Sequence, residues 1–149
     1  SKDELILAVV KSEMGRQDES ITAFEDLSPE NLRLEMAELT TAIFSTDAEP
    51  FRTVLNFEIL AEAQRNPEVA AILQQQDTQM RRRFVSILRR AGIDDPETRT
   101  ELIFTIFSGL SARALRHPEQ ERAALLEVIK DVILKILGDK PVTSSAACA

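Results

Sequence analysis

The chain has 149 residues, enough for one domain with its own hydrophobic core and too few for two comfortable ones. Its net charge of −7 disfavours binding to nucleic-acid phosphates, and no apolar run is long enough to cross a membrane. No secretion signal opens the chain, and its one cysteine, Cys148, has no partner for an internal disulfide. These features predict a cytoplasmic protein with no membrane association.

Helix-start signals recur along the chain from its first residue. Capping-box spacing begins at Ser1 and again at Thr46. Further helix starts are marked by a good N-cap residue directly before a proline, which is favoured at the first helical position. These dipeptides are Ser28-Pro29, Asn66-Pro67 and Asp95-Pro96. Gly92 and Gly138 lie where helix C-caps are expected.

Together these signals predict an all-α fold, a helical bundle of about six helices, because no strand-type alternation occurs anywhere. The predicted helices span roughly residues 2–17, 29–45, 48–65, 67–91, 96–116 and 118–137. The polar segment from Gly15 to Leu27 is left unassigned. Residues 1–137 are expected to form a single domain, and the small, polar tail over 138–149 is expected to be disordered.

The predicted helices differ in how much of their circumference is apolar. The 29–45 and 67–91 helices each have one apolar stripe, as expected for helices that cover a core. The 96–116 helix is apolar nearly all round, and the 118–137 helix has only a narrow polar strip. A terminal helix in so small a domain cannot bury such a wide face within one chain.

We therefore expect the last two helices of two copies to form an intersubunit four-helix bundle, which makes the protein a homodimer. The alternative is one large core that wraps the last helix on both sides. The residues expected at the dimer interface are Leu110, Ala114, Leu125, Val128, Ile129, Val132, Ile133 and Ile136.

Residues that could carry catalysis or hold a metal are few and isolated. His117 stands directly before a proline and is interpreted as a turn residue, and Cys148 has no histidine near it in the sequence. Glu58 and Glu62 are four residues apart, without a histidine to complete a metal site. The Arg81–Arg83 run lacks interleaved aromatic residues and is expected to be a solvated face. We therefore expect no enzymatic activity, no metal and no cofactor.

Aromatic and methionine side chains on the middle helices could converge into a pocket for a small, mostly apolar ligand, because such side chains adapt to greasy molecules. Glu58 and Gln76 stand on otherwise apolar stretches and would orient that ligand. The alternative is that the apolar side chains simply fill the core. The expected pocket residues are Met36, Phe57, Glu58, Gln76, Met80, Phe84, Phe104 and Phe107.

Three stretches resemble the TetR family of transcriptional regulators. The opening residues 1–10, SKDELILAVV, are similar to the start of the helix that joins the family's DNA-binding headpiece to its body. Residues 57–68, FEILAEAQRNPE, are similar to a body helix that ends in Ala-x-Arg-Asn/Asp-Pro. Residues 109–115, followed by His117-Pro118, are similar to the penultimate helix and turn. The resemblance covers the order of helices along the whole chain.

The resemblance implies the ligand-sensing and dimerising body of a TetR-type regulator, expected to be a repressor, with a small-molecule cavity in each bundle. Ligand binding would control operator DNA binding by an N-terminal helix-turn-helix headpiece that this chain lacks. The alternative is a helical protein–protein interaction module with no ligand or DNA role.

Overall fold

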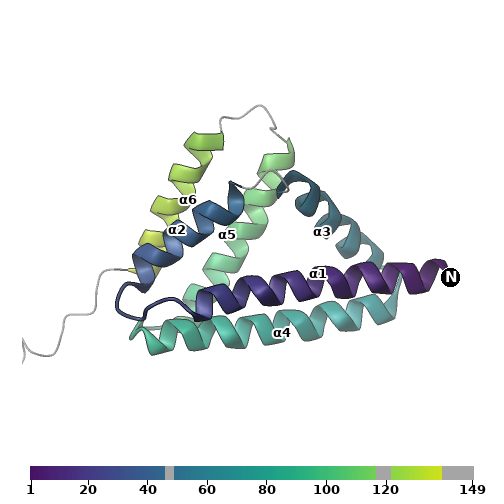
Figure 1. The fold of residues 1–149 in the computed structure, drawn as a ribbon, viewed down its shortest axis with the longest axis horizontal. Helices are drawn as coiled ribbons and strands as arrows, with labels where there is room; N and C mark the ends of the chain where they lie inside the picture. Colours follow the sequence, from purple (N-terminus) through teal and green to yellow (C-terminus); the bar gives the residue numbers. More distant parts are fainter. Residues whose placement is uncertain (46–48, 117–121, 139–149) are drawn as a thin grey trace, which may run out of the picture.

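The computed structural model describes residues 1–45, 49–116 and 122–138. Within these ranges the chain forms helices and no strand, which confirms the predicted all-α fold (Figure 1). The helices are α1 (Lys2–Glu25), α2 (Leu32–Phe44), α3 (Glu49–Ala63), α4 (Pro67–Arg90), α5 (Pro96–Arg116) and α6 (Arg122–Leu137). The predictions made for Thr46, His117, Pro118, Cys148 and the tail from residue 139 lie outside the described residues.

Several helix ends have the caps that the sequence predicts. At the start of α1, the Ser1 hydroxyl accepts a hydrogen bond from the backbone N–H of Glu4 at 3.3 Å, and the Glu4 side chain completes the capping box. Before α4, the Asn66 side chain accepts from two backbone N–H groups at 3.1 and 3.3 Å. Gly92 and Gly138 have φ of 71° and 74°, the left-handed conformation of a helix C-cap that glycine adopts without strain.

Among the described residues, two helices have a boundary that differs by three residues or more from the sequence prediction. Helix α1 continues through the unassigned polar segment to Glu25, because Ile21 and Phe24 on its last turns are buried in the core. Helix α2 begins at Leu32, three residues after Pro29. Residues 29–31 form a turn, and the N–H of Ser28, which precedes this turn, donates to the Glu35 carboxylate at 2.9 Å.

The helices pack as two pairs with α5 between them (Figure 1). Helices α1 and α4 lie side by side and run in the same direction: Gln76 donates to the Met14 carbonyl at 3.4 Å, and Arg83 lies further along both helices. Helices α2 and α6 run in opposite directions, since Arg33 near the start of α2 donates to the Leu137 carbonyl at the end of α6. Helix α3 packs on α4 and α5.

Two hydrophobic clusters hold this arrangement together. The main cluster joins the C-terminal half of α1 to α2, the C-terminal half of α4, α5 and α6. At its centre, the Phe84 ring packs edge-on against Phe24 and Phe104, with centroid distances of 5.7 and 5.5 Å. The smaller cluster joins the N-terminal half of α1 to α3 and the start of α4, and its buried members are Val10, Met14, Ile59 and Val69. Each half of α1 therefore contacts a different core.

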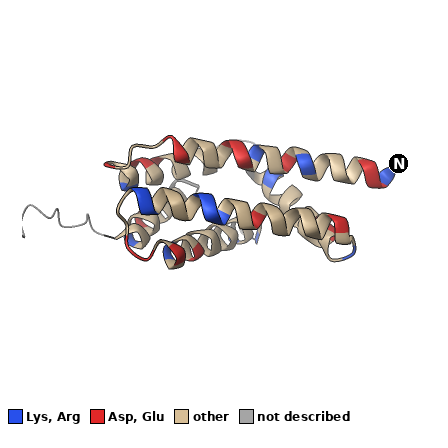
Figure 2. Ribbon diagram, turned by 90° about the horizontal axis from the view of Figure 1, so that it is seen from below, with Lys and Arg blue, Asp and Glu red and all other residues tan. Residues whose placement is uncertain are grey.

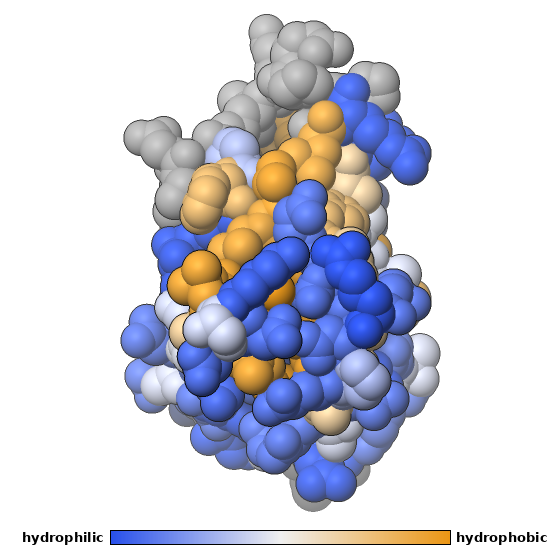
Figure 3. Space-filling view, turned by 90° about the vertical axis from the view of Figure 1, so that its right-hand side faces the viewer, coloured by the Kyte–Doolittle hydropathy of each residue, from blue (hydrophilic) through white to orange (hydrophobic). Residues whose placement is uncertain are grey.

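The surface is charged at one end of the molecule and hydrophobic at the other. Figure 2 shows basic residues gathered on the C-terminal half of α4, with acidic residues on the neighbouring part of α1. At the other end, Figure 3 shows a band of hydrophobic side chains. The exposed hydrophobic residues of α3 are Phe51, Val54, Phe57 and Leu60. Helix α3 therefore buries one side and leaves a second apolar side uncovered.

Candidate functional site

The structure brings five of the eight expected pocket residues together. Met36 and Phe84 are buried in the main cluster, and the partly buried members that pack against it include Met80, Phe104 and Phe107. Phe84 and Phe104 are in direct ring contact, and Phe107 lies 5.7 Å from Phe44 in centroid distance. These side chains contact one another or the surrounding core.

The other three expected pocket residues lie elsewhere. Phe57 is 40% exposed on the uncovered side of α3, and its neighbour Glu58 is also exposed. Gln76 is half-buried and donates to the Met14 backbone carbonyl, so this amide links α4 to α1. None of the eight lines either of the two cavities described below.

The residues expected at the dimer interface also divide into groups. Ile129 and Ile133 are fully buried in the chain's own main cluster. Val128 is 53% exposed, and the half-buried members are Leu110, Leu125, Val132 and Ile136. The side chain of Ala114 lies outside what the structure describes. Within one chain, α6 therefore buries one face and exposes part of another.

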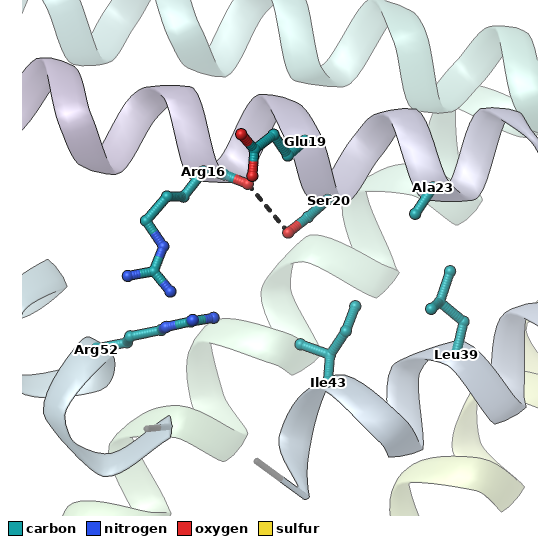
Figure 4. A pocket seen from close by; sticks show the side chains of 7 residues that line it. All are labelled: Arg16, Glu19, Ser20, Ala23, Leu39, Ile43 and Arg52. Carbon is teal, nitrogen blue, oxygen red and sulfur yellow. Dashed lines mark hydrogen bonds between the residues drawn. The ribbon is translucent and has the colours of Figure 1, made fainter. Parts of the chain in front are cut away.

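A cleft of about 250 Å³ lies between α1, α2 and the start of α3 (Figure 4). Its lining residues are Arg16, Glu19, Ser20, Ala23, Leu39, Ile43 and Arg52. Arg16 and Arg52 extend toward one another from α1 and α3, whereas Leu39 and Ile43 form the α2 side (Figure 4). The cleft therefore has a cationic end and an apolar end.

Neither arginine of this cleft stands out in the sequence as a candidate site residue. Arg16 lies in the polar segment from Gly15 to Leu27, and Arg52 stands among apolar residues, beside Phe51 and close to Val54 and Leu55. A polar residue in an apolar stretch is the signal that drew attention to Glu58 and Gln76. The same signal could have identified Arg52, but nothing local pairs it with Arg16, 36 positions earlier.

A different arginine forms the main polar contact between α1 and α4. The guanidinium of Arg83 donates to Glu25 and to the Thr22 hydroxyl, each at 3.0 Å, and it also pairs with Asp18. The hydrogen bond with Glu25 is the main cause that raises the pKa of Arg83 above its usual value. This guanidinium is satisfied by its own chain, and its arrangement is that of a structural contact.

We also searched the described part of the chain for a metal site and for a membrane-spanning helix. Within residues 1–45, 49–116 and 122–138, no three histidine, cysteine, aspartate or glutamate side chains gather as metal ligands would. Over the same ranges, no helix combines the length and the apolar character that a membrane crossing requires.

Comparison with known proteins identifies the family. Residues 32–135 match the family model described as "Tetracyclin repressor-like, C-terminal domain". The chain belongs to this family. No curated protein and no solved structure matches the chain.

The match confirms the resemblance that the sequence suggested. A tetracyclin repressor-like C-terminal domain is the body of a TetR-type regulator, in general a ligand-binding and dimerising domain. The matched range begins at the first residue of α2 and ends near the end of α6, so it includes the resembling stretches at 57–68 and 109–115. Helix α1, including its opening stretch, lies outside the match.

Proposed function

We propose that this tetracyclin repressor-like domain senses a small molecule and forms a homodimer. In the parent protein, ligand binding would control operator binding by a helix-turn-helix headpiece, and the parent would act as a repressor. The observation that carries this proposal is the family match over residues 32–135. The net charge of −7 is consistent with DNA contact made by another part of the protein.

The proposed dimer contact uses α5 and α6. Large apolar side chains are exposed on both helices: Leu102 is 47% and Leu115 39% exposed on α5, and Val128 is 53% exposed on α6. Helix α5 also has an open hollow of about 500 Å³ around Gly109 and Leu110. Apart from its chain neighbours and the backbone of its own helix, no heavy atom of the described residues lies within 4 Å of the position that a Cβ at Gly109 would take, so a side chain of a second copy has room to enter there.

Ile129 and Ile133 are buried within the chain and would therefore not contact a second copy directly. Because both side chains stabilise the chain's own core, the contact with a second copy would depend on Val128 and on the half-buried residues around it. Two α5–α6 pairs would then form the intersubunit four-helix bundle.

The expected pocket remains part of the proposal. Since Phe84 contacts Phe24 and Phe104, an apolar ligand would enter between these rings by displacing them. Such a ligand should raise the melting temperature, because it binds the folded state and not the unfolded chain.

Light scattering on a sizing column tests the dimer. The chain is expected to elute with about twice its mass of 16.7 kDa at micromolar concentration. Val128→Glu should give a monomer with little change in melting temperature, because this exposed charge is solvated in the monomer but would be buried unpaired in a dimer. Leu5→Glu is the matched control: it makes the same change at a residue that is 66% exposed on α1, and the dimer should persist. If the unsubstituted chain is a monomer at this concentration, the proposed dimer is contradicted, and the alternative of a helical protein–protein interaction module is favoured.

A further inference from the structure

The cleft between α1, α2 and α3 contains two guanidinium groups that form no direct pair with a carboxylate of the described residues. Neither the Arg16 nor the Arg52 guanidinium forms an ion pair or a side-chain hydrogen bond with any residue that the structure describes. The Nε of Arg52 is buried without a hydrogen-bond partner. A buried donor without an acceptor is costly, and two facing guanidinium groups repel each other unless an anion lies between them.

Other arginines of the chain show what a satisfied guanidinium looks like. Pairs with carboxylates are formed by Arg65, Arg81, Arg83, Arg89 and Arg99. Arg82 is exposed on α4, where water solvates it. The cleft differs from both situations, because one of its arginines is half-buried with an unpartnered Nε and the other points toward it (Figure 4).

The remaining residues of the cleft define the size and charge of a matching ligand. Among the described residues that line the cleft, Glu19 is the one acidic residue, and it offsets one of the two positive charges. The net charge of about +1 suits a monoanion. Ala23, Leu39 and Ile43 supply an apolar wall beside the cationic end. The volume of about 250 Å³ is below the 300–1,000 Å³ typical of pockets for drug-sized ligands, so the ligand would be small.

We propose that this cleft binds a small amphipathic monocarboxylate, whose carboxylate lies between the guanidinium groups of Arg16 and Arg52 and whose apolar part contacts Leu39 and Ile43. Arginine suits this role because its planar fork of N–H donors matches the two oxygens of a carboxylate. The carboxylate would accept the hydrogen bond that the Nε of Arg52 lacks.

The inference goes beyond the proposed function by adding a second site, separate from the expected pocket around Phe84, and a ligand class for it. It depends on that function only in treating the ligand as a regulatory signal. Binding to the cleft can be measured on the chain whether or not it dimerises.

Isothermal titration calorimetry with hexanoate tests the site. Hexanoate should bind the parent chain, whereas 1-hexanol and hexylammonium, which share its apolar tail, should bind at least 10-fold more weakly. Arg52→Ala and Arg16→Ala should each weaken hexanoate binding by roughly 10- to 100-fold, because each removes a charge-assisted hydrogen bond. Arg52→Lys should retain part of the affinity, since it keeps the charge but loses the fork.

Matched variants separate a local site from general charge attraction. Arg82→Ala makes the same change in net charge on an exposed face and should leave hexanoate binding within about twofold. Ala23→Leu should block the apolar part of the cleft and abolish binding, with folding checked by circular dichroism. If Ala23→Leu does not fold, a series from acetate to hexanoate replaces it: affinity should rise with each added CH₂.

Several outcomes would overturn the inference. The first is that hexanoate gives no heat of binding up to millimolar concentration. The second is that the unsubstituted chain and Arg52→Ala bind hexanoate equally well. The third is that hexyl phosphate binds more tightly than hexanoate. If the unsubstituted chain is a dimer and hexanoate does not bind to it, the proposed function stands without this site. If hexanoate binds through Arg52 to a monomeric chain, the site stands without the dimer.

Discussion

Helix α1 contacts two arginine sites that lie close together along its length but differ in chemistry. Toward its C-terminal end, Asp18 and Glu25 neutralise Arg83 of α4. On its side toward α2 and α3, Arg16 faces Arg52, and no carboxylate of the described residues pairs with either. A guanidinium that is paired within the chain holds two helices together, whereas an unpaired one in a cleft is available to a ligand.

The hydrophobic contacts of α1 show the same division. Phe24 near its end is buried in the main cluster, whereas Leu5 near its start is 66% exposed. The C-terminal half of α1 is therefore anchored by packing and ion pairs. The N-terminal half depends on the smaller cluster around Val10 and Met14.

Phe24→Ala would remove the strongest anchor of the C-terminal half. We expect it to lower the free energy of unfolding by about 3–5 kcal/mol, because a buried ring in contact with Phe84 leaves a cavity. Urea denaturation followed by circular dichroism measures this change. Leu5→Ala should change the stability by less than about 0.5 kcal/mol, and similar losses for both variants would show that the two halves of α1 are equally anchored.

Arg83→Met would remove the ion pairs and keep much of the side-chain volume. We expect a loss of about 1–2 kcal/mol, since the partly exposed Asp18 and Glu25 would lose their shared partner. Arg82→Met, on an exposed neighbour, should cost less than about 0.5 kcal/mol.

The ionisation of Arg83 determines how the stability lost in Arg83→Met depends on pH. The hydrogen bond with Glu25 raises the pKa of Arg83, so its stabilising charge is present below the unfolded-state pKa and is lost only above the folded-state value. Because arginine is already strongly basic and its pKa is raised further here, Arg83 stays protonated through the neutral range in both states. The stability difference between the unsubstituted chain and Arg83→Met should therefore stay constant from about pH 6 to about pH 9. A steep decline within that window would contradict the assignment.

Gly15→Ala should produce the smallest change, a gain of about 0.5–1 kcal/mol. Gly15 lies within α1, and apart from its chain neighbours and the backbone of its own helix, a Cβ added there would meet no heavy atom of the described residues within 4 Å. The variant therefore restricts the unfolded chain without a clash. Thermal denaturation measures the gain. A loss of stability would mean that the middle of α1 needs the conformational freedom of glycine.

Local signals predicted much of the fold. The capping box at Ser1, the Asn66-Pro67 start of α4 and the C-cap glycines depend on neighbouring residues, and the structure contains them. The end of α1 was missed because its last turns are mostly polar. Ile21 and Phe24, three residues apart, are the only sign there of the buried face.

The candidate sites were less predictable, because they depend on which faces meet. The sequence placed Phe57 and Phe84 in one pocket, but Phe57 is exposed on α3 and Phe84 is central to the main cluster. Whether a wide apolar helix such as α6 buries Ile129 in its own chain or in a partner is also a tertiary property. The approach of Arg16 and Arg52 depends on how α3 packs, for which the local sequence contains no signal.

The parallel arrangement of α1 and α4 has a consequence during synthesis on the ribosome. Two parallel helices cannot be joined by a short turn, and here the contact between Glu25 and Arg83 spans 58 positions of the chain. At about 5–20 residues per second, α1 is complete roughly 3–12 s before Arg83 is added. During that interval Ile21 and Phe24 have no α4 to pack against, so the nascent chain presents an apolar helix end that a chaperone could bind.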